Sequence, residues 1–202
     1  DILLDLAQNS EARTRALVLS AGGEQMGDDP EVTRLMIQEM RDGGAEQASS
    51  LAWALSRSGR PEARHALIDA LREGSRQTGS VVASALAQSA GPDVWAALSE
   101  VARDAKSPAR AAALQGLISS GAPDALAVAK NALLGDDEGL AGTAAWGLAT
   151  VESPAAREIL RGAAKAGNPN VRSAAIRALA QSGRSEDVDT LASLVGADDA
   201  LV

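Results

Sequence analysis

The sequence lacks cysteine, tyrosine and phenylalanine, and its 202 residues include one histidine and three tryptophans. Without cysteine the chain forms no disulfide, zinc–thiolate site or thiolate nucleophile. A single histidine, His65, cannot build a zinc site of the usual kind. We therefore expect no catalytic residue, no metal and no cofactor. A cysteine-free chain suits a reducing or an oxidising compartment equally, so localisation stays open.

Long apolar runs are also missing. None approaches the roughly 18 residues that a membrane span requires, and the first residues lack the basic start of a signal peptide. Alanine, in contrast, makes up about a fifth of the chain, and it is the best helix former and permits close helix contacts. Strand formers are scarce, so the composition favours an all-helical protein without a membrane span.

Two residue types recur with a fixed period of 31 residues. The leucines are Leu55, Leu86, Leu117, Leu148 and Leu179, and the prolines are Pro30, Pro61, Pro92, Pro123 and Pro154. A period in this range is the signature of a solenoid, in which each unit buries its apolar face by stacking on its neighbours. We predict one all-α solenoid of about six helical hairpins over residues 1–202.

Each repeat splits into two helical segments. The first opens on the proline, which suits the first helical turn, and glycines at Gly43, Gly74 and Gly167 are expected to end it. The second carries the leucine, with apolar residues three and four positions before it. Residues two positions before and after the leucine lie about 160° from it on the helix, and we expect them to face away from the core.

The stretch 168–183 reads Asn-Pro-Asn-Val-Arg-Ser-Ala-Ala-Ile-Arg-Ala-Leu-Ala-Gln-Ser-Gly. It resembles the HEAT-like repeat of the phycobilisome-lyase type, and residues 107–121 are a weaker copy. The valine–arginine pair of this motif, Val171-Arg172, keeps only its arginine, Arg110, in the weaker copy. The resemblance implies a right-handed superhelix of helical hairpins whose second helices line the concave face.

We therefore predict that the positions two before and two after each leucine form a concave protein-binding face. They are Trp53, Arg57, Ser84, Gln88, Gln115, Ser119, Trp146, Thr150, Arg177 and Gln181. Tryptophan is enriched at binding hot spots, so Trp53 and Trp146 are the expected anchors. The alternative is that they fill gaps beside the alanine-rich helices. We expect Trp95, in a first helix, to pack partly buried, and His65 to be a surface residue.

Three acidic clusters stand between helical segments: Asp28-Asp29, Asp136-Asp137-Glu138 and Asp198-Asp199. Helix N-termini prefer aspartate, so we interpret the clusters as caps, although sequence alone leaves catalytic carboxylate pairs open. The connection from Glu24 to Asp29 is five residues longer than its equivalents. Such insertions are tolerated in solenoid loops and sometimes bind partners.

The net charge of −8 is unevenly distributed, because residues 153–184 carry six basic residues and one acidic residue. This belt is either a solvated outer face or a docking patch for an acidic partner.

These patterns favour a non-enzymatic scaffold that binds a protein or an extended peptide. The resemblance offers two alternatives, an accessory subunit of a bilin-lyase-like enzyme and a nucleic-acid-binding protein, since some HEAT-like proteins are DNA glycosylases. A DNA-binding groove needs basic residues, and the predicted concave positions are mostly neutral, so we expect no nucleic-acid partner. Neither end of the sequence shows a polar cap, and we expect a longer native array and end-to-end association.

Overall fold

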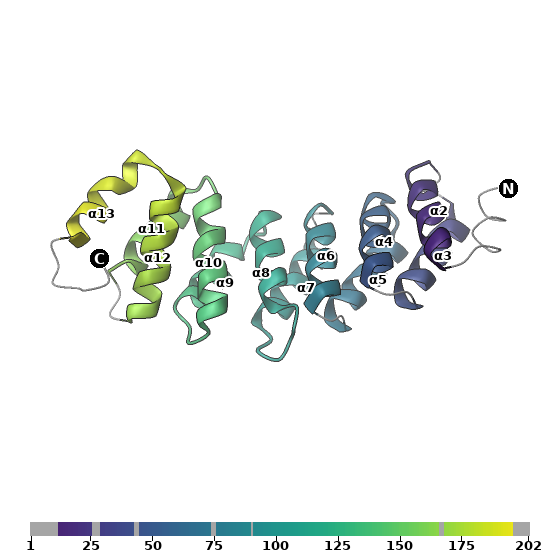
Figure 1. Ribbon diagram of the computed structural model, residues 1–202, viewed down its shortest axis with the longest axis horizontal. Coiled ribbons are helices and arrows are strands. Elements are labelled where there is room, and N and C mark those ends of the chain that lie inside the picture. The colour runs from purple at the N-terminus through teal and green to yellow at the C-terminus, as the bar shows by residue number, and fades with distance from the viewer. Residues whose placement is uncertain are drawn as a thin grey trace. The chain divides into compact units, whose positions relative to one another are not determined.

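The computed structural model describes residues 12–25, 29–42, 45–73, 76–89, 91–165 and 168–195, and every regular element in these residues is a helix (Figure 1). The chain divides into two compact units, Asp1–Gly116 and Leu117–Val202. We describe each unit by itself. The expectation of one continuous array therefore stays a prediction.

The first unit consists of helices that pack in consecutive pairs. They are α2 (Ala12–Gln25), α3 (Pro30–Asp42), α4 (Ala45–Arg57), α5 (Pro61–Glu73), α6 (Arg76–Ala87), α7 (Pro92–Arg103) and most of α8 (Arg110–Ser119). Equivalent helices of successive repeats also pack on one another. Among the second helices, α4 contacts both α2 and α6. Among the first helices, α5 contacts both α3 and α7. The predicted α-solenoid fold is confirmed.

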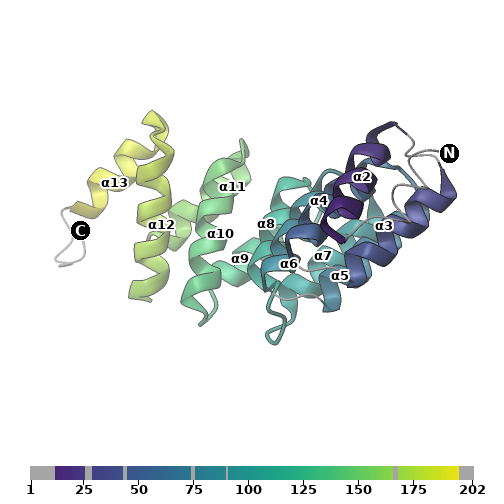
Figure 2. The ribbon, with the colours of Figure 1, turned by 45° about the vertical axis from the view of Figure 1, so that its right-hand side comes forward.

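The second unit continues the pattern (Figure 2). Its helices are α9 (Ala125–Leu133), α10 (Glu138–Thr150), α11 (Pro154–Ala163), α12 (Pro169–Ser182), a short 3-10 turn at Ser185–Asp187 and α13 (Val188–Val195). Helix α9 packs on α10, α11 packs on α12, and the second helices α10 and α12 pack on one another. This last contact positions the groove described below.

The periodic leucines form the centre of the core. All five are at most 1% exposed, and so are the apolar residues three and four positions before them in the four repeats from Leu55 to Leu148. The position just before each leucine is always alanine or glycine, and it is buried in every repeat. Helix faces were thus predicted correctly from the period alone.

Four of the five periodic prolines are the first residue of a helix, at α3, α5, α7 and α11. Pro123 differs, because α9 begins two residues later at Ala125. The second segments end at Gly59, Gly121 and Gly183, which adopt φ values of 63 to 67°. This left-handed backbone favours glycine, and it stops the helix. The predicted caps Gly43, Gly74 and Gly167 lie outside the described residues.

The longer first connection is partly helical, which corrects the prediction of a loop from Glu24 to Asp29. Helix α2 continues to Gln25, six residues past Leu19, whereas α4 ends at Arg57, two residues past the equivalent Leu55. Four of the five extra residues therefore lengthen the helix by about one turn. Residues 26–28 lie outside the described part of the chain.

Charged side chains link successive first helices in the first unit. Arg41 of α3 lies 3.9 Å from Asp69 of α5, and Arg72 of α5 lies 2.7 Å from Glu100 of α7. The two pairs have the same register, one repeat apart. They are exposed, so each contributes little to stability on its own. Arg110 of the family motif instead makes a contact within its repeat, where its Nε donates to the carbonyl oxygen of Ala102 at 3.1 Å.

We predict opposite effects for two glycine-to-alanine changes. A Cβ at Gly116 would lie 2.9 Å from the carbonyl oxygen of Ala83, so α6 and α8 would have to move apart. A Cβ at Gly142, in the interior of α10, meets nothing within 4 Å. Gly142→Ala should therefore raise the free energy of unfolding by about 0.5 to 1 kcal/mol, while Gly116→Ala should lower it despite the same gain in helix propensity.

Urea denaturation of both variants measures the difference. A stabilised Gly116→Ala protein would show that α6 and α8 are not in close contact.

Candidate protein-binding face

We use the name second-helix face for the ten predicted positions, considered within each unit by itself. The structure places nine of them exposed and one, Gln115, half-buried. Trp53, Arg57, Ser84, Gln88 and Gln115 belong to the first unit, and Ser119, Trp146, Thr150, Arg177 and Gln181 belong to the second. Their exposure follows from the helical angle between them and the buried leucines. Whether they bind a partner stays a prediction.

The two tryptophans of this face are not core residues. Trp53 is 39% exposed and Trp146 is 53% exposed, whereas the neighbouring leucines are at most 1% exposed. Trp95 on α7 is half-buried with its Nε1 atom enclosed, as predicted for a packing residue. His65 on α5 is exposed, also as predicted.

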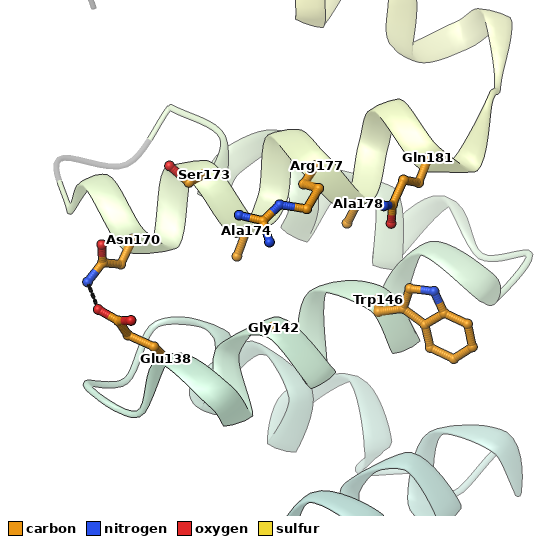
Figure 3. A pocket seen from close by; sticks show the side chains of 9 residues that line it. All are labelled: Glu138, Gly142, Trp146, Asn170, Ser173, Ala174, Arg177, Ala178 and Gln181. Carbon is orange, nitrogen blue, oxygen red and sulfur yellow. Dashed lines mark hydrogen bonds between the residues drawn. The ribbon is translucent and has the colours of Figure 1, made fainter. Parts of the chain in front are cut away.

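A groove of about 480 Å³ runs between α10 and α12 (Figure 3). It brings together three of the predicted residues, Trp146, Arg177 and Gln181. It also contains residues that the sequence prediction missed, namely Glu138, Gly142, Asn170, Ser173, Ala174 and Ala178. Gly142 and Ser173 precede Trp146 and Arg177 by four residues, so extending the predicted face by one helical turn would have found them.

The polar groups of the groove are unevenly placed. At the N-terminal ends of the two helices, Nδ2 of Asn170 donates a hydrogen bond to Oε1 of Glu138. Figure 3 shows the Arg177 side chain reaching into the groove between this pair and Trp146, with Gln181 above the indole. The groove therefore has a carboxylate that accepts a hydrogen bond at one end, an aromatic surface at the other and a guanidinium between them.

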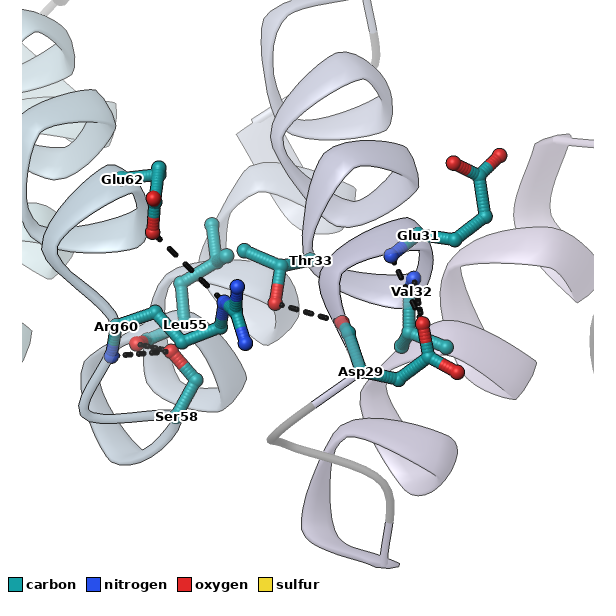
Figure 4. Close-up of polar contacts among 8 residues, drawn as sticks. All are labelled: Asp29, Glu31, Val32, Thr33, Leu55, Ser58, Arg60 and Glu62. Atoms are coloured by element: carbon teal, nitrogen blue, oxygen red, sulfur yellow. Dashed lines mark hydrogen bonds and ion pairs between the residues drawn. The ribbon is translucent and has the colours of Figure 1, made fainter.

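One aspartate of each of the first two acidic clusters caps a helix. Oδ1 of Asp29 accepts from the backbone N–H of Glu31 at 2.8 Å, and the carbonyl oxygen of Asp29 accepts from Oγ1 of Thr33 (Figure 4). Asp137 accepts from the N–H of Leu140 at 3.0 Å at the start of α10. The capping interpretation is confirmed for these two residues. Asp28, Asp198 and Asp199 lie outside the described residues.

Shifted pKa values occur on the first helices. A hydrogen bond from Arg34 lowers the pKa of Glu31, although slight desolvation opposes it, and the same bond raises the pKa of Arg34. For Asp93, desolvation raises the pKa, but the N–H of Val94 and the Arg64 guanidinium outweigh it, so the net shift is downward. These shifts arise from ion pairs on the surface and, for Asp93, from a hydrogen bond donated by the N–H of Val94 in the first turn of α7.

Comparison with known proteins supports the assignment of the repeats. The sequence model of the family described as HEAT repeats matches residues 126–202, which include α10, α12 and the groove. Residues 126–202 are thus similar to HEAT repeats. No curated protein sequence matches it significantly.

Two solved structures extend the likeness beyond the matched residues. One is the complex of CpcE and CpcF of phycocyanin lyase from Nostoc sp. PCC7120, with a TM-score of 0.56 and 19% identity over 93% of this chain and 78% of that one. The other is human deoxyhypusine hydroxylase in complex with glycerol, with a TM-score of 0.50 and 13% identity over 98% of this chain and 91% of that one. At these identities the likeness shows the fold alone.

The chain is an all-helical repeat protein whose second helices expose polar and aromatic side chains. None of its described helices is both long and apolar enough to cross a membrane.

Proposed function

We propose that this helical-repeat protein is a non-enzymatic scaffold whose second-helix face binds a protein or an extended peptide. The observation that carries the proposal is the exposure of both tryptophans of that face, 39% for Trp53 and 53% for Trp146. The chain has only three aromatic residues of the Phe, Tyr and Trp type, and two of them are exposed on this face. A tryptophan side chain supplies a large contact area with few rotatable bonds.

Two further observations support a protein partner. The α10–α12 groove presents Trp146 together with side-chain amide, hydroxyl and guanidinium groups, a combination suited to peptide backbone and side chains. The phycocyanin lyase structure that this chain resembles in fold is itself a complex of two proteins.

The charge of the chain argues against a nucleic-acid partner. Binding to phosphates requires several cations along one groove, whereas the α10–α12 groove contains one arginine and one glutamate. The net charge of −8 adds a repulsive field.

We expect Trp53→Ala and Trp146→Ala to weaken partner binding by about 1 to 4 kcal/mol each. Since both side chains are exposed, the melting temperature should change little. Proteins that the immobilised chain retains from an extract of its source cells would be quantified by mass spectrometry for wild type and each variant. Trp95→Ala is the matched control, and it should lower stability because Trp95 is half-buried.

A retained set that is the same for wild type and the double variant would contradict the proposal. So would a large loss of stability in either single variant, because it would show that the tryptophans serve packing. Retention on heparin at moderate salt would favour the nucleic-acid alternative instead.

A further inference from the structure

We propose that the α10–α12 groove binds an acidic extended segment of the partner protein, with a carboxylate on Arg177 and a neighbouring apolar side chain on Trp146. This inference rests on the proposed function and specifies the partner's chemistry. The groove lies within the second unit, so it does not depend on how the two units are placed.

The charge of the groove favours a carboxylate. Arg177 is the only basic residue in the lining, it is exposed, and no described residue forms an ion pair or a hydrogen bond with its side chain. The only acidic lining residue, Glu138, already accepts a hydrogen bond from Asn170 at the far end. Because the Arg177 side chain has no partner among the described residues, its guanidinium donors can bind an incoming carboxylate in a bidentate geometry.

The basic belt of residues 153–184 contributes one cation, Arg177, to the groove lining. Arg157 lies 3.5 Å from Glu186, and Arg161 lies 2.6 Å from Asp187, so these two cations are paired within the protein. Arg177 is the belt residue that faces the groove (Figure 3). Within the belt, Arg157 and Arg161 neutralise acidic residues of the same chain, whereas Arg177 is the cation that binds the partner.

The shape of the groove favours an extended chain. Gly142, Ala174 and Ala178 have no long side chains, so a peptide backbone can lie close to both helices. Ser173 and Gln181 offer hydroxyl and amide groups that can hydrogen-bond to peptide N–H and carbonyl groups. A volume of about 480 Å³ accommodates a few residues, and the 53% exposed indole of Trp146 can cover one apolar side chain.

The test is selection of a phage-displayed library of random twelve-residue peptides on the whole chain, followed by affinity measurements with fluorescein-labelled synthetic copies of the enriched peptides. Wild type should enrich Asp or Glu within two positions of an aromatic or large aliphatic residue. These peptides should bind Arg177→Glu and Trp146→Ala at least about tenfold more weakly. Selection on Arg177→Glu should enrich lysine and arginine instead.

Lys130→Glu is the matched control. It makes the same change of charge in the same unit, but on α9 and outside the groove, and it should leave the affinity of the enriched peptides within about twofold. Arg177→Gln removes the charge without reversing it and guards against misfolding of the glutamate variant. Both Arg177 variants should melt like wild type, because Arg177 is exposed.

Failure of this inference can be told from failure of the proposed function. Enriched peptides that lose affinity in Trp53→Ala but bind Arg177→Glu and Trp146→Ala normally would leave the binding function standing and overturn this assignment. Enrichment of basic peptides by wild type would also overturn it. No enrichment at all, or binding only of a single-stranded DNA oligonucleotide, would contradict both.

Discussion

Leu86→Ala is expected to lower the free energy of unfolding by about 2 to 5 kcal/mol, whereas Gln88→Ala, two residues further along, should change it by no more than about 0.5. Leu86 is fully buried at the centre of its repeat, and alanine would leave a cavity there. Gln88 is exposed on the second-helix face. Urea denaturation followed by circular dichroism measures both changes.

The next repeat provides an independent copy of the same experiment. Leu117 is 0% exposed and Ser119 is exposed, so Leu117→Ala and Ser119→Ala should differ in the same way. Comparable losses at Leu117 and Ser119 would mean that the helix faces are assigned wrongly, and the predicted binding face would fail with them.

Arg161→Ala is expected to lower the free energy of unfolding by about 3 to 5 kcal/mol, because it leaves a buried carboxylate without its cation. The carboxylate is that of Asp187, which is 1% exposed. Nε of Arg161 donates to Oδ1 of Asp187 at 2.8 Å, and a second guanidinium nitrogen donates to the carbonyl oxygen of Glu186 at 2.9 Å. These bonds tie the 3-10 turn before α13 to α11.

Arg72→Ala is the control for this prediction. Arg72 lies 2.7 Å from Glu100, but both side chains are well exposed, so its removal should cost at most about 1 kcal/mol. Chemical denaturation of the two variants under the same conditions compares them. Equal losses at Arg161 and Arg72 would show that the Asp187 carboxylate is solvated rather than buried.

The fold could be predicted from the 31-residue period, because the angle between a residue and the periodic leucine around the helix axis determines whether that residue is buried. The leucines are buried, and the residues two positions before them, among them Trp53 and Trp146, are exposed except for the half-buried Gln115. Both outcomes need only the 100° step between residues. Caps such as Asp29 and Asp137 were predictable for a similar reason, since the bond between a cap and its helix is local in sequence.

The buried acids could not be predicted in this way. Glu39 falls on the apolar stripe of α3 and is 8% exposed, and its partner is Arg15 of α2, at 3.0 Å. Asp187 is likewise matched by an arginine from the preceding repeat. Aligning the repeats shows whether a given repeat position is polar or apolar. It does not show which side chain from another helix contacts the residue at that position.

Only part of the groove lining could be predicted from the sequence. Trp146, Arg177 and Gln181 came from the angle of the second helix, but the width of the space between α10 and α12 depends on small side chains at Gly142 and Ala174. Alanine and glycine are frequent throughout this chain. Composition therefore does not distinguish a small residue that lines the groove, such as Gly142, from one that lies at a contact between helices, such as Gly116.

The central claim is that the second-helix face binds the partner, and site-directed photocrosslinking tests it most directly. Because the chain has no cysteine, a single cysteine carrying a benzophenone label can be placed at Gln88 or Gln181 on that face, and at His65 or Lys130 on first helices. All four side chains are exposed, so the labels should not disturb folding. We expect a protein to crosslink from Gln88 or Gln181 and not from His65 or Lys130. Crosslinking only from the first-helix positions would contradict it.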